Sequence, residues 1–249
     1  MSHEKSEKLL VLPDWRTVSL RALCLGMFLV RMNVEEGLKR KAVTSDKAPQ
    51  GLAESLDRYL KNHGVLASLS PNEKTLVGKP VGSWAMQDIV NTSWRAEALG
   101  SILWALTQFE SLPPYDTPFV LPEILGKLGN PDDFPNRTTL RTPIELSKAR
   151  NAAELWHWRA RTAVVQRRGV APPPGLTFPG IIAQSAKMAF QERLIPQPID
   201  NDFPFSGKPY SKLSDAEYQN AGSIAQERHF AFNWLCGYSA NWDETSTST

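Results

Sequence analysis

The sequence predicts an all-α protein, a compact array of about seven helices joined by proline-rich connections, with few or no strands. Three observations predict this class. Capping residues mark helix starts, and glycines mark helix ends. No segment shows the sustained alternation, rich in Val, Ile and Thr, that is typical of strands.

The helix starts are capping boxes at residues 70–73, 142–145 and 214–217. In each box a Ser or Thr at the N-cap is followed three residues later by Glu, so both side chains satisfy backbone N–H groups of the first turn. The first two boxes also place proline at the first helical position, where no N–H is needed. Glycines end three helices, which are predicted over 52–63, 143–168 and 215–236.

Apolar residues at helical spacing predict four more helices, over 16–33, 84–110, 122–128 and 179–194. The first belongs to the most apolar stretch of the chain, which contains Arg21 and Arg31. Only nine residues separate these two arginines, whereas a membrane-spanning helix needs roughly 20 apolar residues. We therefore expect a central buried helix here and no membrane contact.

One helical domain is expected over residues 13–242, preceded by a flexible N-terminus (1–12) and followed by a loose tail (243–249). The N-terminus lacks the apolar core of a signal peptide. Two cysteines cannot form a disulfide framework in a chain of 249 residues. The sequence therefore indicates a soluble, cytoplasmic protein whose Cys24 and Cys236, both in apolar helical runs, are reduced and buried.

Motifs for several kinds of chemistry are missing from the sequence. It has no phosphate-binding loop, no dinucleotide fingerprint and no nucleophile elbow, so no cofactor is predicted. Glu154 and His157 have the spacing of half a dinuclear metal site, but no second Glu-x-x-His pair occurs, so no metal is predicted. Residues 141–169 are basic, yet the chain has 28 Lys+Arg against 26 Asp+Glu, and we expect no nucleic-acid binding.

Charged residues on apolar helix faces are the unusual feature of this sequence. Arg95 and Arg228 each follow an apolar stripe, and His157 lies among small apolar residues of a third helix. A buried Arg must be paired, and Glu97 and Glu227 are the nearest acidic residues by helix phase. The sequence thus predicts one cluster with an aromatic lining. Its members are Arg95, Glu97, His157, Arg161, Glu227 and Arg228, and its lining candidates are Trp94, Trp158 and Trp234.

Several of these segments resemble the uncharacterised, mainly bacterial family catalogued as domain of unknown function 4272. The resemblance is carried by Ser93–Glu97 with Leu103–Leu106, by His157–Arg161, by Glu227–Leu235 and by the closing Trp242-Asp243. It spans roughly Arg16 to the C-terminus. It implies a soluble, mostly helical protein and supplies no reaction, cofactor or partner.

Two functional hypotheses follow. The first is a protein-binding module, of which an immunity-type protein in bacterial competition is one example. The alternative is an enzyme or small-molecule binder for an anionic ligand, with Arg95 and Arg228 holding the anion and Glu227 or His157 as acid–base. Exposure separates the two, because an enzyme needs these groups around a pocket that is open to solvent. A sealed ion-pair network that only fixes helix register is the structural interpretation of the same residues.

Overall fold

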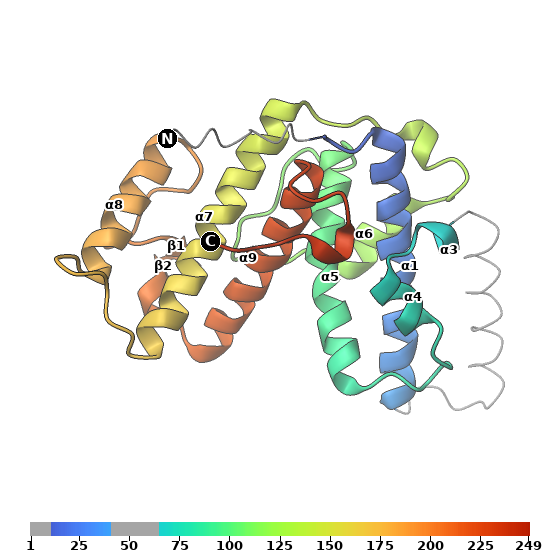
Figure 1. Ribbon diagram of the computed structural model, residues 1–249, viewed down its shortest axis with the longest axis horizontal. Coiled ribbons are helices and arrows are strands. Elements are labelled where there is room, and N and C mark those ends of the chain that lie inside the picture. Colours follow the sequence, from blue (N-terminus) through green and yellow to red (C-terminus); the bar gives the residue numbers. More distant parts are fainter. Residues whose placement is uncertain (1–10, 41–64) are drawn as a thin grey trace, which may run out of the picture.

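The computed structural model describes residues 11–40 and 65–249. Its long helices lie in a row, in the order α8, α7, α9, α5 and α1 across the longest axis of the molecule (Figure 1). The helices are α1 (Trp15–Lys39), α3 (Val65–Ser68), α4 (Pro71–Val77), α5 (Met86–Ala105), α6 (Leu121–Leu128), α7 (Pro143–Arg167), α8 (Phe178–Gln191) and α9 (Asp215–Leu235). Three short 3-10 turns are η1 (Pro135–Arg137), η2 (Tyr210–Lys212) and η3 (Trp242–Glu244).

The prediction of a mostly helical protein is confirmed. The only strands in the described part of the chain are β1 (Pro204–Phe205) and β2 (Lys208–Pro209), which form a small antiparallel hairpin. All three capping boxes form, with the Ser or Thr side chain accepting the N3 amide and the Glu side chain accepting the N-cap amide. The helix predicted over 52–63 and the flexible N-terminus up to residue 10 lie outside the described residues.

Helix ends differ from the prediction where the backbone turns left-handed without a glycine. The helix α5 ends at Ala105 rather than at residue 110, because Thr107 adopts a φ of +60°. In the same way α8 ends before Arg193, which has a φ of +57°. Such conformations are uncommon for residues other than glycine, so no residue type in the sequence marks these two helix ends.

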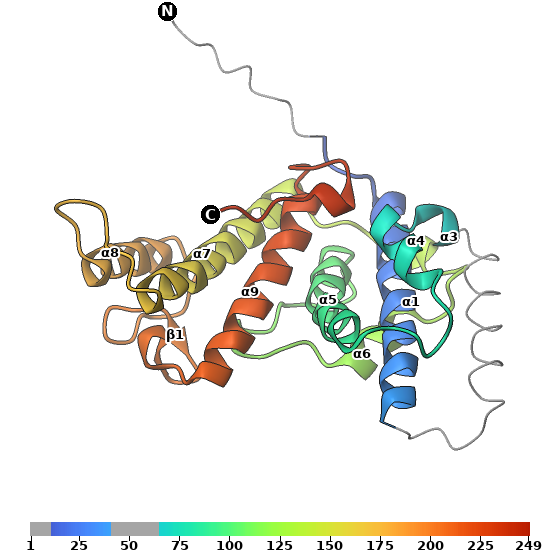
Figure 2. The same ribbon diagram turned by 60° about the horizontal axis from the view of Figure 1, so that its bottom comes forward.

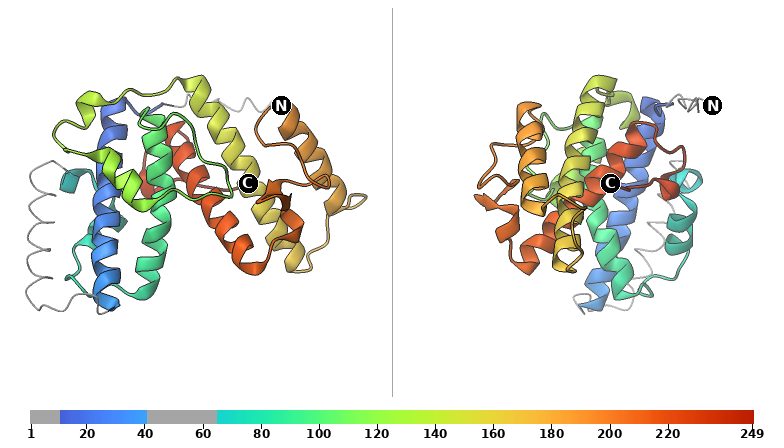
Figure 3. Two further views of the ribbon diagram at one scale, coloured as in Figure 1. Left: turned by 180° about the vertical axis from the view of Figure 1, so that it is seen from behind. Right: turned by 60° about the vertical axis from the view of Figure 1, so that its left-hand side comes forward.

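The helix α9 joins two apolar clusters. The apolar residues at the end of α9 and at its C-cap pack with α1, α5 and the start of α7 in the larger cluster; they are Ala231, Phe232, Trp234, Leu235 and Cys236. Residues Ala221 and Ala225, near the other end of α9, pack with α7, α8 and the β hairpin in the smaller one. Figure 2 shows α9 crossing between these two groups of elements, and Figure 3 shows the helices from behind and turned so that the side of α8 comes forward.

The two buried arginines of α1 are both ion-paired. Arg21 donates from Nη2 to Glu73 of α4 at 2.6 Å, and Arg31 donates from Nε to Glu35 at 2.9 Å. By length and composition alone α1 could cross a membrane, but 72% of its most apolar window is buried inside the protein. This is weak evidence for a membrane span, since the core helix of a folded protein meets the same criteria.

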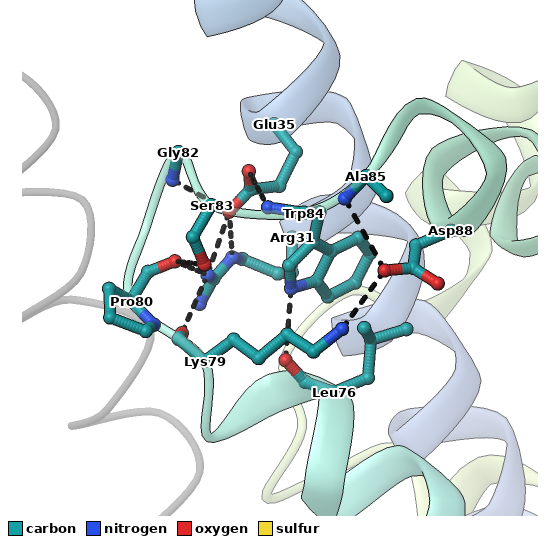
Figure 4. Close-up of polar contacts among 10 residues, drawn as sticks. All are labelled: Arg31, Glu35, Leu76, Lys79, Pro80, Gly82, Ser83, Trp84, Ala85 and Asp88. Carbon is teal, nitrogen blue, oxygen red and sulfur yellow. Dashed lines mark hydrogen bonds and ion pairs between the residues drawn. The ribbon is translucent and has the colours of Figure 1, made fainter.

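The Arg31–Glu35 pair fastens the segment before α5 to α1 (Figure 4). Arg31 also donates to the carbonyl oxygens of Lys79 and Pro80, and Glu35 accepts the backbone N–H groups of Gly82 and Trp84. The buried charges are therefore compensated partly by each other and partly by backbone dipoles, as a buried pair requires. The Trp84 side chain, fully buried, is thereby held against α1.

The C-terminal segment differs from the loose tail predicted from residue 243. Asp243 accepts the backbone N–H of Asn72 at 2.9 Å, Thr245 is buried, and Asn233 donates to the carbonyl of Ser246 at 2.8 Å. Polar residues can anchor a tail as firmly as apolar ones when they meet unsatisfied backbone groups. The two cysteines are buried and form no disulfide, in agreement with the prediction.

Gly100 of α5 gives the first testable prediction. A Cβ atom added there would overlap the ring of Phe119, on the segment that follows α5. We expect Gly100→Ala to lower the free energy of unfolding by about 1–3 kcal/mol through overpacking, measured by urea denaturation. Gly222→Ala in α9 is the control, because nothing lies within 4 Å of its added Cβ; it should stabilise by up to about 1 kcal/mol. If Gly100→Ala raised the free energy of unfolding as Gly222→Ala does, the result would contradict the close packing at Gly100.

Candidate functional site

The six charged residues predicted to cluster do not form one site. The structure divides them into a sealed ion pair (Arg228–Glu97), a second pair that lines an open cleft (Arg95–Glu227), and two residues that lie elsewhere (His157 and Arg161). The four residues of the two ion pairs are neighbours, since Arg228 and Glu227 are consecutive on α9 and Glu97 influences the pKa of Glu227.

The sealed pair joins α9 to α5. The Nε of Arg228 donates to Glu97 Oε2 at 2.8 Å, and both side chains are almost completely buried. The remaining guanidinium nitrogens of Arg228 donate to the carbonyl oxygens of Pro113, Pro114 and Thr117, at 2.7, 3.2 and 2.9 Å. Every nitrogen of this guanidinium group is therefore occupied by the protein itself.

Glu97 completes the arrangement from the other side. Its Oε1 accepts the backbone N–H of Phe119 at 2.8 Å, so both carboxylate oxygens have partners. The rings of Tyr115 and Phe119 lie 4.9 and 5.1 Å from the guanidinium carbon of Arg228. The pair holds the segment between α5 and α6 against α5 and α9. Arg228 and Glu97 thus match the interpretation in which these charged residues form a sealed ion pair that fixes helix register.

The second pair is accessible. The Nη1 of Arg95 donates to Glu227 Oε2 at 3.0 Å, and 30% of the Arg95 side chain is exposed against 12% of the Glu227 side chain. The guanidinium carbon of Arg95 also lies 4.6 Å from the centre of the Phe230 ring. Burial raises the pKa of Glu227, while the neighbouring charge of Arg95 opposes that rise.

Arg95 and Glu227 line a cleft of about 640 Å³ between α4, α5, α9 and η3, which we call the acidic cleft. Among the described residues that line it, one is basic, Arg95, and four are carboxylates: Glu73, Asp88, Glu227 and Asp243. Four carboxamide side chains and four aromatic rings also contribute, and these are Asn72, Gln87, Asn91, Gln226, Phe28, Trp94, Phe230 and Trp242.

The carboxylates of the acidic cleft differ in how far a neighbouring cation compensates their negative charge. Glu73 pairs with the buried Arg21 at 2.6 Å, and Asp88 pairs with Lys79 at 3.0 Å. Within the described part of the chain, Asp243 accepts only a neutral backbone N–H, from Asn72. The cleft therefore presents more negative than positive charge to solvent.

His157 lies in a different environment from the two ion pairs. Its Nδ1 lies 3.1 Å from the Nδ1 of His229, and the two side chains are buried between α7 and α9. Burial, together with the nearby charge of Arg161, lowers the pKa of His157 to about 4. Burial also lowers the pKa of His229 to about 3, helped by His157 and Arg150. Both rings are neutral at pH 7, and neither reaches the acidic cleft.

The prediction for Arg161 is wrong, because the buried arginine of α7 is Arg159. Arg161 is exposed, whereas Arg159 is fully buried and forms two hydrogen bonds with Asp202, at 2.6 and 2.8 Å. The signal for Arg159 was available, since helical spacing puts it on the face of Trp156 and Ala163. Asp202 gave no signal, because it belongs to a segment without periodicity.

The three predicted aromatic residues also separate. Trp94 lines the acidic cleft, whereas Trp158 is half-buried beside Phe203 in the smaller apolar cluster. Trp234 is buried and lies 5.3 Å from the ring of Trp242. Trp242 was not among the predicted lining residues, although it forms a wall of the cleft.

The two residues of the Glu-x-x-His spacing of α7 have different protein partners. Glu154 forms two hydrogen bonds with Arg150, at 2.6 and 2.9 Å, one helical turn away, and His157 faces His229. Within residues 11–40 and 65–249 no group of three or more His, Cys, Asp or Glu side chains is placed to hold a metal ion.

Fold and site together therefore define an all-α protein with a polar cleft between its central helices. Residues 3–184 match the family described as "Domain of unknown function (DUF4272)". The chain belongs to this family. The match includes α5 with Trp94, Arg95 and Glu97, and it ends before α9 and η3. Comparison with curated proteins gives no match, and comparison with solved structures gives none either.

The different burial of the two ion pairs predicts different costs of breaking them. We expect Glu97→Gln to lower the free energy of unfolding by about 3–5 kcal/mol, because it leaves the charge of Arg228 buried without a counter-charge. The matched control is Glu227→Gln, whose partner Arg95 is partly exposed, and it should cost about 1 kcal/mol or less. Urea denaturation measures both. Equal losses of unfolding free energy in the two variants would show that burial does not make one ion pair costlier to break than the other.

The buried histidine pair predicts a loss of stability in mild acid. Both pKa values are lowered on folding, so the unfolded chain binds more protons than the folded chain once the pH falls below about 6.5. Stability should be fully present above pH 6.5 and fall towards pH 4, by up to about 1.4 kcal/mol per pH unit for each histidine. The variant His157→Gln/His229→Gln should show a shallower pH dependence of unfolding free energy, and an unchanged slope would contradict this assignment.

Proposed function

We propose that this chain is a binding protein that holds a positively charged segment of another protein in the acidic cleft. The observation that carries the proposal is the cleft itself, about 640 Å³ and open to solvent, with four carboxylates and one arginine in its lining. Volumes of this order are typical of ligand sites. An excess of carboxylates favours a cationic occupant through electrostatic complementarity.

The state of the arginines supports this proposal over an anionic ligand. Arg228 is sealed, and all of its nitrogens donate to protein oxygens. Arg95 lines the cleft but is already engaged by Glu227 and by the ring of Phe230. An anion would have to compete with Glu227 for Arg95 while lying close to three further carboxylates.

Carboxamide side chains in the lining support a polypeptide as the occupant. Asn and Gln carry both a donor and an acceptor, so they can pair with the N–H and C=O groups of an extended main chain. Gln87, Asn91 and Gln226 are exposed at the cleft, on α5 and α9. Trp94 adds a partly exposed aromatic surface between them, of the kind enriched at protein interfaces.

A second candidate function is an enzyme in which Glu227 acts as acid–base. The observation that favours it is the raised pKa of Glu227, a carboxyl group that lines a cleft open to solvent. His157, the other predicted acid–base, is buried away from the cleft. The charge of the cleft points such an enzyme towards cationic rather than anionic substrates.

Selection of peptides from a random displayed library tests the proposed function. We expect the selected peptides to be enriched in Lys and Arg over Asp and Glu. Asn91→Lys places a cation in the cleft at an exposed position, and it should weaken their binding about tenfold or more, which is about 1.4 kcal/mol. Gln184→Lys is the control, since it adds the same charge at an exposed position of α8, outside the lining of the cleft.

Fluorescence polarisation of labelled peptides measures these affinities. The proposal fails if the selected peptides are acidic, or if Asn91→Lys binds basic peptides as well as the unaltered chain does. Peptides that bind the Asn91→Lys and Gln184→Lys variants equally would place the interaction on another surface.

A further inference from the structure

The four carboxylates of the acidic cleft each keep one oxygen without a hydrogen-bond partner among the described residues. The bonds that these residues give to Glu73, Asp88, Glu227 and Asp243 all go to the Oε2 or Oδ2 atom. The Oε1 or Oδ1 atoms accept none, and none of them is closed off from solvent. The sealed Glu97, by contrast, uses both of its oxygens. The cleft therefore offers free acceptors to a ligand that carries several N–H donors.

Arg95 shows how a guanidinium group fits among these acceptors. Its Nη1 donates to Glu227 Oε2 at 3.0 Å, and its guanidinium carbon lies 4.6 Å from the centre of the Phe230 ring. The described residues give the charged group of Arg95 this one hydrogen bond and this one ring, whereas that of Arg228 has four hydrogen bonds. The Arg95 side chain is also 30% exposed. Glu227 and Phe230 thus form a guanidinium site, and the arginine in it is held by few contacts.

We propose that an arginine of the bound segment takes the place of Arg95 against Glu227 and Phe230, which rests on the proposed function and names the residue that anchors the segment. The exchange replaces one cation by another, so Glu227 keeps a counter-charge throughout. Arg95 is long and already partly exposed, so its guanidinium group can move into water. An anion bound to Arg95 would instead leave Glu227 without its counter-charge, which is costly for a group with little exposure.

The chemistry of this position favours arginine over lysine. A guanidinium group is planar, so it can lie on an aromatic ring while its N–H groups point outwards to carboxylate oxygens. Phe230 supplies the ring, which the nearly perpendicular ring of Trp242 supports at 4.7 Å, and Glu227 supplies the oxygens. A lysine ammonium group is a compact and strongly hydrated charge. It can pair with Glu227 but gains less from the ring.

Fluorescence polarisation with two labelled peptides of equal length tests this inference. In one peptide arginine alternates with glycine, and in the other lysine alternates with glycine. The two carry the same charge, so a difference in affinity reports recognition of the guanidinium group. We expect the arginine peptide to bind the unaltered chain more tightly, by about tenfold or more. Asn91→Lys should weaken the binding of both peptides, which places both in the acidic cleft.

Loss of the ring tests the role of Phe230 without changing any charge. Phe230→Leu should lower the affinity for the arginine peptide to that for the lysine peptide, and leave the latter unchanged. Phe190→Leu is the matched control, because it removes the same ring at an exposed position of α8, outside the lining of the cleft. It should leave both affinities unchanged. The melting temperature of each variant shows whether it folds.

Removal of Arg95 tests the exchange. Arg95→Gln should strengthen binding of the arginine peptide by about tenfold, and by more than it strengthens binding of the lysine peptide, because the incoming guanidinium group no longer competes with a resident one. Lys79→Gln is the matched control. Lys79 pairs with Asp88 but does not line the cleft, so its loss also leaves one cleft carboxylate without a cation. It should strengthen both peptides alike.

The outcomes separate this inference from the proposed function. If neither peptide binds, or if Asn91→Lys changes neither affinity, the proposed function fails and the arginine site with it. If both peptides bind in the cleft with equal affinity, only the arginine site is overturned, because the cleft then recognises charge alone. If Arg95→Gln weakens binding of the arginine peptide, Arg95 stays in place and contacts the segment, which overturns the exchange.

Discussion

The buried ion pair between Arg228 and Glu97 is the interaction on which the rest of the arrangement depends. It joins two helices that lie more than a hundred residues apart in the chain, and it also binds the segment between α5 and α6 through three carbonyl oxygens and one N–H. A charge sealed in this way is stable only while all of its partners are in place. The position of α9 against α5, and with it the width of the cleft between them, is therefore fixed by electrostatics as well as by apolar packing.

One turn of α9 carries residues with three different roles because successive side chains point in different directions. Glu227 faces the acidic cleft, Arg228 faces the sealed pair with α5, and His229 faces α7. The same rigid element therefore sets the charge of an open surface and closes two interfaces. A shift of α9 that improved any one of these contacts would disturb the other two.

The segment after α9 divides the open surface into two cavities of opposite character. Trp242 contributes to both, with the carboxylates of the acidic cleft on one side and the guanidinium group of Arg21 on the other. The Arg21–Glu73 pair runs between them, since Glu73 lines the first cavity and Arg21 lines the second. Tail residues therefore belong to the architecture of the surface, and the bond from Asn72 to Asp243 holds them there.

The sequence by itself determined the helical class, the starts of α4, α7 and α9, and the presence of charges on apolar faces. These features are local, because capping needs residues three apart and helix phase needs only the periodicity of one segment. Phase also identified Glu97 and Glu227 as the acidic residues nearest to the two arginines. Phase also separates Arg159 from Arg161 by about 200° around α7, but the prediction placed Arg161 in the cluster, and this residue proved exposed.

Only the tertiary structure decided which charges are sealed and which face solvent. The pairing of Arg228 with Glu97, of Arg159 with Asp202 and of His157 with His229 joins segments that no local pattern connects. Exposure depends in the same way on what packs over a residue from elsewhere in the chain, as the anchored tail and Trp242 show. Helix phase gives the direction of a side chain from its own axis, and the packing of distant helices supplies what that side chain meets.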